Sequence, residues 1–155
     1  MSFRGASVAN ITKMKQSDIF RNVHQTVVGT VSVDAAITTN EDVLPMGTLL
    51  TSSDGGLSWS TLTAPAYVAG TYQIGDEVYF EGHTFTNDVS NNTAVPTDPS
   101  WTDNGEWNAN GVLYVDLQAT AKATVVVSAD VVKSTLSGFD EFLRASLFKN
   151  KILVK

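Results

Sequence analysis

Apolar and polar residues alternate along several short stretches of this chain, a pattern typical of strands with one buried face. The stretch 27–33, VVGTVSV, places β-branched residues between small polar ones. Two later stretches, 112–117 and 123–128, are rich in valine and leucine, and the chain ends in KILVK at 151–155. These four stretches predict strands, and the polar, glycine-containing segments between them predict turns.

One helix is predicted close to the C-terminus. The spacing of four apolar residues places them on one helical face that is expected to be buried; they are Phe139, Phe142, Leu143 and Leu147. Ser137 is expected to be the N-cap residue, with the Asp140 carboxylate reaching back to it in a capping box. Asn150 is expected to end the helix in the left-handed conformation.

The strongest local pattern lies in the middle of the chain, in YQIGDEVYFEGHTF at 72–85. Val78 and Phe80 fall on one face of the expected strand, and Tyr79 falls on the other. Glu81-Gly82 suits a two-residue hairpin loop, in which a positive φ angle favours glycine. The stretch therefore predicts a compact aromatic hairpin.

Charge separates this middle region from the rest of the chain, whose net charge is −6. Seven acidic residues and no Lys or Arg lie between Ala66 and Trp107, whereas the remainder has ten basic and nine acidic residues. Such an acidic region repels phosphates, so nucleic acid is not an expected partner. No apolar run approaches the roughly 20 residues of a membrane helix, so no membrane association is expected.

Together these patterns predict a mainly β protein with one C-terminal helix, of the α+β class. Three regions are expected. Residues 1–26 form an extended arm with an excess of positive charge, and residues 27–64 and 108–155 form one β-rich core. Residues 65–107 form a small all-β aromatic insert within that core. Because a loop tolerates added residues at small entropic cost, the core is expected to fold even without the insert.

The outer parts of the chain resemble the head decoration proteins of lambda-like tailed phages. The resemblance rests on VLPMGTLLT at 43–51, on GVLYVDLQATAKATVVVSADVVKSTL at 111–136, and on the final KNKILVK. It implies a capsid cement protein that sits on the outer surface of the virion head, after synthesis in the host cytoplasm. It also implies the major capsid protein as partner, a homotrimer at threefold positions, and an N-terminal arm laid on the shell. The arm residues expected to bind the capsid are Phe3, Arg4, Val8, Ile11, Lys13, Lys15, Ile19 and Arg21.

The insert has a resemblance of its own, to the small chitin- and cellulose-binding modules of bacterial glycoside hydrolases. It rests on the spacing of Tyr72, Gly75, Val78, Phe80, Gly82 and Phe85, followed by Pro96 and Trp101. The chain has Asn87-Asp88-Val89 where the family carries a tandem aromatic pair. An acidic surface module that binds polysaccharide weakly or not at all is therefore the first interpretation of the insert. The alternative for the whole chain is a free carbohydrate-binding or adhesin domain that attaches to host or environmental polysaccharide and has no capsid role. The residues that could stack on a sugar are Tyr67, Tyr79, Trp101 and Trp107.

Nothing in the sequence indicates catalysis. The chain has no cysteine, and its two histidines, His24 and His83, have no partner at metal-ligand spacing. No nucleotide-binding or nucleophile-elbow motif occurs. We therefore expect no enzymatic activity, no cofactor and no metal site.

Overall fold

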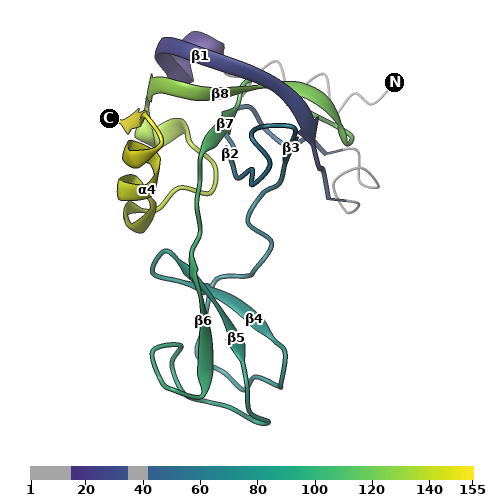
Figure 1. The fold of residues 1–155 in the computed structure, drawn as a ribbon, viewed down its shortest axis with the longest axis vertical. Coiled ribbons are helices and arrows are strands. Elements are labelled where there is room, and N and C mark those ends of the chain that lie inside the picture. The colour runs from purple at the N-terminus through teal and green to yellow at the C-terminus, as the bar shows by residue number, and fades with distance from the viewer. Residues whose placement is uncertain (1–14, 35–41) are drawn as a thin grey trace.

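The computed structural model describes residues 15–34 and 42–155, and within them the protein is mainly β with a short helix near the C-terminus. This confirms the predicted fold class. Figure 1 shows an elongated molecule in which one sheet occupies the upper end and a smaller sheet the lower end. We call residues 15–64 and 108–155 the body, and residues 65–107 the insert.

A long antiparallel pair of strands forms the centre of the body. Strand β1 (Phe20–Val31) pairs with β8 (Ala121–Val131) along its whole length. On the far side of β8 lie β7 (Gly111–Leu113) and then β2 (Leu49–Leu50), while β9 (Ile152–Val154) runs parallel to the other end of β8. The short strand β3 (Ser58–Trp59) runs parallel to the end of β1.

The body sheet closes on itself. Thr51, directly after β2, exchanges backbone hydrogen bonds of 2.9 and 3.0 Å with Ser60, directly after β3. The pairings therefore run in a ring from β2 through β7, β8, β1 and β3 and back to the end of β2. Closure pairs the ends of β2 and β3, which would otherwise be the two edges of the sheet, but in the described part of the chain it leaves residues 21–28 of β1 paired with β8 alone. It also encloses a core cluster around Trp59, Leu50 and Leu113.

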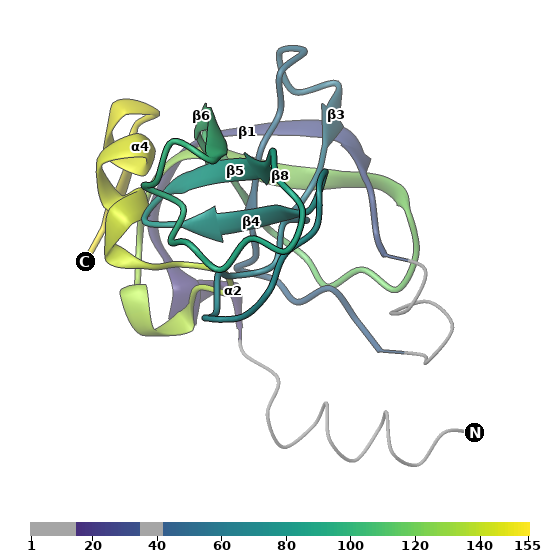
Figure 2. The same cartoon turned by 90° about the horizontal axis from the view of Figure 1, so that it is seen from below.

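The C-terminal part of the chain covers one side of this sheet (Figure 2). It consists of two 3₁₀ turns, η1 (Lys133–Thr135) and η2 (Glu141–Leu143), followed by helix α4 (Arg144–Lys149) and β9. Leu143 and Leu147 are fully buried against the body core. The helical segment thus fills the space between the sheet and the insert.

Three details of the helical segment η2–α4 differ from the predictions. Asp140, not Ser137, is the N-cap residue of its first turn, η2, because the Asp140 carboxylate accepts a hydrogen bond of 2.9 Å from the Phe142 backbone. Ser137 is instead part of a bridge to Thr48. Phe142 is exposed rather than buried. Lys151, with φ of 67°, takes the left-handed position expected for Asn150.

The insert carries the predicted hairpin. Strands β4 (Glu77–Phe80) and β5 (His83–Asn87) are antiparallel, and β6 (Trp101–Glu106) extends the sheet on the other side of β5. Glu81 and Gly82 both have positive φ angles, 50° and 87°, as a type I′ turn requires. The hairpin prediction is confirmed, including its loop.

Aromatic packing and a buried amide network hold the insert together. Val78, Phe85 and Trp101 form its core, with Tyr67, Tyr72 and Phe80 packed around them. The buried side chain of Asn87 donates hydrogen bonds to two backbone carbonyls, and Asn92 donates one of 2.7 Å to Asn87. So small a domain has little apolar area to bury, and these contacts replace a larger core.

The expected arm over residues 1–26 ends earlier in the structure. A one-turn helix, α2 (Gln16–Ile19), precedes β1, which begins at Phe20 instead of residue 27. Residues 21–26 are exposed and include several polar side chains. They therefore lack the alternation that reveals a strand in the sequence.

Gly29 offers a test of how tightly β1 and the turn before β3 are packed. A Cβ atom at this position would lie 2.2 Å from the backbone oxygen of Gly56. We expect Gly29→Ala to lower the free energy of unfolding by about 1–3 kcal/mol, as overpacked sites do. Chemical denaturation would measure it. Gly70→Ala, where the nearest atom is 3.9 Å away, is the control, and equal stability of the two variants would contradict the packing described.

Candidate functional site

The molecule has two candidate binding regions, which lie at opposite ends of its long axis. Helix α2 and the outer side of β1 form the upper end in Figure 1, and the insert forms the lower end. The described chain begins at Lys15, immediately before α2. Of the predicted capsid-binding residues, Lys15 and Arg21 lie at the upper end, whereas the predicted sugar-binding residues belong to the insert.

A groove of about 400 Å³ lies at the upper end. Its apolar lining comes from Phe20, Val23 and Tyr114, and the rings of Phe20 and Tyr114 meet edge to face at 5.0 Å between centroids. Gln16 ties α2 to the opposite wall, since its side-chain amide donates a hydrogen bond of 2.9 Å to the Tyr114 carbonyl. Lys15, Ser17 and Arg21 complete the polar part of the lining.

Lys15 and Arg21 differ from most other cations of the body. Among the described residues they have no ionic partner, whereas Lys133, Arg144, Lys149 and Lys155 all contact carboxylates. Both predicted contact residues thus lie in one groove with their charges available. An unpaired cation beside an apolar surface favours an acidic ligand.

Ile19 does not belong with them. Its side chain is only 1% exposed and packs in the main core cluster of the body. The prediction that Ile19 binds the capsid is therefore wrong: α2 turns the residue inward, where it helps to anchor the start of β1. The other predicted arm residues lie outside the described residues; they are Phe3, Arg4, Val8, Ile11 and Lys13.

At the lower end, the four predicted sugar-stacking residues do not share an exposed face. Trp101 is 5% exposed and belongs to the insert core, against which the half-buried Tyr67 packs. Tyr79 is 9% exposed and Trp107 is half-buried, and both pack against the body core. These four residues therefore form no exposed stacking platform, because packing within and beneath the insert uses their rings.

Tyr79 joins the insert to the body. Its ring points away from the insert core and enters the main core cluster together with Leu143 and Leu147. Its hydroxyl donates a hydrogen bond of 2.7 Å to the Asp140 carboxylate, the N-cap of η2. Burial, and then this hydrogen bond, raise the pKa of Tyr79 well above its usual range.

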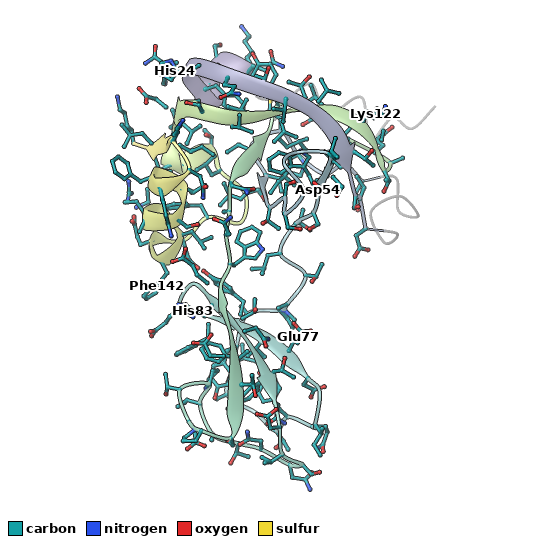
Figure 3. All side chains as sticks on the ribbon, viewed as in Figure 1. His24, Asp54, Glu77, His83, Lys122 and Phe142 are labelled. Atoms are coloured by element: carbon teal, nitrogen blue, oxygen red, sulfur yellow. The ribbon has the colours of Figure 1, made fainter. Side chains whose placement is uncertain are left out.

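Further contacts surround Tyr79 at the junction between the insert and the body. The turn of the hairpin contacts η2, because a Cβ at Gly82 would lie 3.2 Å from Phe142, and Figure 3 shows Phe142 and the neighbouring His83 at this junction. Glu106 of β6 pairs with Lys149 of α4 at 3.5 Å. The return strand is held as well, since Asn150 donates a hydrogen bond of 2.8 Å to Asn108. The insert is therefore seated on the body at several points.

The rest of the insert surface is acidic. His83 hydrogen-bonds to Asp103 at 3.0 Å, and this contact lowers the pKa of the Asp103 carboxyl. Serine hydroxyl and backbone donors likewise lower the pKa of Asp98. These carboxylates stay ionised at neutral pH, so this end of the molecule keeps its negative charge.

Residues 15–34 and 42–155 contain no group of three or more His, Cys, Asp or Glu side chains placed to hold a metal ion. In the same part of the chain, no helix is long and apolar enough to cross a membrane. The chain matches no protein-family model, no curated protein and no solved structure.

Sequence reasoning missed several residues of these two regions. Phe20, Val23 and Tyr114 line the groove, and Asp140 binds Tyr79. The pairs Phe20–Tyr114 and Tyr79–Asp140 are far apart in the sequence, so no local pattern connects their members. The only available signal was the Tyr79 ring, which the alternation of β4 placed on the face opposite Val78 and Phe80.

The raised pKa of Tyr79 makes stability depend on alkaline pH. The folded state keeps the Tyr79 proton above pH 10, where an unfolded tyrosine loses it. The stability that the protonated Tyr79 hydroxyl contributes is therefore complete below about pH 10. It is lost as pH rises from there toward the pKa of Tyr79 in the folded state. We expect the free energy of unfolding to fall more between pH 8 and 10.5 in the wild type than in Tyr79→Phe. Denaturant melts of both proteins at the two pH values would measure this difference. An equal fall in the free energy of unfolding in both proteins would contradict it.

The burial of Tyr79 in the body core also changes what we expect when the insert is removed. Deleting residues 66–107 and joining the ends with a short glycine-rich turn takes the Tyr79 ring out of the body core. Loss of a buried aromatic side chain costs about 3–5 kcal/mol, so we expect a body that is markedly less stable than the full chain or does not fold. A shortened protein as resistant to denaturant as the full chain would show that the insert is an independent module.

Proposed function

We propose that this protein is a capsid decoration protein that binds the outer surface of a phage head and directs its acidic insert away from the shell. The proposal rests first on the resemblance of the outer segments to lambda-like decoration proteins. The observation that carries it is the opposition of the two ends. The N-terminal segment, with its excess of positive charge, joins the body beside α2, and the acidic insert lies at the far end (Figure 1).

The contacts between the insert and the body support this orientation. Tyr79, Gly82 and Glu106 all contact the helical segment of the body, so the insert has a defined direction instead of swinging on flexible linkers. If the upper end contacts the shell, the seven carboxylates of each insert face the solvent. Repeated over many copies, they give the particle a negative outer layer that opposes aggregation.

A trimer at threefold positions is part of the proposal. A closed ring matches a site of the same symmetry and leaves no open interface. Contacts linked in one assembly also raise one another's effective concentration, so that weak individual contacts hold firmly. The described residues do not favour polysaccharide binding, because the aromatic residues suited to it are engaged in packing.

Binding to purified heads tests the proposal. We expect the full chain to sediment with empty heads that lack it, and to raise the temperature at which filled heads release their DNA. A chain that starts at Lys15 should remain folded, because it keeps Ile19 and the whole of β1, but should lose most of its binding with the arm. Circular dichroism would check that it folds.

Failure of the full chain to sediment with the heads at micromolar concentration would refute the proposal. Retention of the full chain on chitin or cellulose, with no binding to heads, would favour the adhesin alternative instead.

A further inference from the structure

Strand β1 has an outer edge that is open over most of its length. β8 pairs with one side of β1 from Phe20 to Val31, but β3 covers the other side only at Thr30 and Val31. In the described part of the chain, residues 21–28 have backbone pairing only with β8. Figure 1 shows β1 at the upper end of the molecule, with β8 below it and no strand above it.

The side chains of this edge are exposed too. Residues 21–26 are all exposed, Val23 is 40% exposed and Val28 is 65% exposed. An open edge with free backbone donors and acceptors is a template for one more strand. Addition of an extended segment to such an edge is a common mode of peptide recognition, in which backbone hydrogen bonds supply affinity and side-chain pockets supply specificity.

The insert contains a second open edge, and comparison of the two indicates the chemistry of the partner. Among the described strands, β6 pairs only with β5, and the exposed residues of β6 include Asp103 and Glu106 but no cation. The β1 edge carries Arg21, and the groove beside it adds Lys15. An acidic segment is therefore attracted to β1 and repelled by β6.

The groove gives this added strand a place for its side chains. Alternate residues of a strand point to the same face. A carboxylate there can reach the unpaired cations Lys15 and Arg21, and an apolar side chain can pack on Phe20, Val23 and Tyr114. The combination of an open backbone edge, two free cations and an aromatic floor occurs on one surface of the body.

We propose that the edge of β1 over residues 21–28, with its adjacent groove, binds an extended acidic segment of the capsid protein as an added strand. This inference rests on the proposed function and names a contact that the folded body makes in addition to the arm. Bulges interrupt the pairing of β1 with β8 around residues 21 and 24–26. They bend the strand, so the added segment is short and follows a curved edge.

Charge reversal in the full chain tests the acidic partner. The double variant Lys15→Glu/Arg21→Glu should bind heads more than tenfold more weakly than the wild type. The matched control is Lys122→Glu/Lys151→Glu, which makes the same change of net charge at two other cations without an ionic partner among the described residues. The control should bind within about twofold of the wild type, and equal weakening in both variants would overturn the inference, because a general charge effect would then explain it.

Hydrogen exchange on the wild-type protein bound to heads tests the added strand. We expect amides within residues 21–28 to exchange more slowly in the complex, and amides of β6 within residues 102–106 to exchange as in the free protein. Unchanged exchange along β1 would overturn the added strand, even if the charge variant binds weakly. Failure of the wild type to bind heads at all would instead remove the proposed function, and this inference with it.

Discussion

The arrangement of this molecule depends on one tyrosine that crosses from the insert into the body. Tyr79 belongs to strand β4, whose opposite face builds the insert core, yet its ring is buried among the leucines of the C-terminal helical segment. Because β strands point alternate residues to opposite faces, one short strand serves two cores. The hydrogen bond from the Tyr79 hydroxyl to Asp140 fixes the orientation of the ring, because the same carboxylate is held in place as the cap of η2.

The burial of Tyr79 in the body explains why a small acidic domain inserted in a loop can keep a defined orientation. Two unconstrained linkers would let the insert rotate, but here the entering segment pairs with β4 through Pro65 and Tyr67, and the leaving segment is tied to α4 through Asn108. At the other end of the body, ring closure leaves β1 with one short covered section and a longer open edge. Within the described residues, the protein therefore has an insert of fixed orientation at one end and a strand with an open edge at the other. We propose that these ends face the solvent and the shell.

Local patterns predicted the parts of the fold that depend on neighbouring residues. The hairpin followed from alternation around Val78 and from the glycine at position 82, and β8 from the valines at 125–127. The start of β1 was missed because both faces of that section are exposed, which leaves no alternation to detect. The N-cap was assigned to Ser137 because its hydroxyl suits the role, but the backbone of Ser137 is bound in a bridge to the loop before β2. Contacts such as Tyr79–Asp140 depend on the tertiary fold and have no signature along the chain.

A cryo-electron microscopy map of decorated heads, at a resolution that separates the two ends of this molecule, would show directly which end binds the shell. We expect density for β1 and α2 against the shell, with the three-stranded sheet of the insert farthest from it and in the orientation that Tyr79 fixes. A map in which the insert lies against the shell, or in which its density is smeared while the body is sharp, would contradict the proposed orientation.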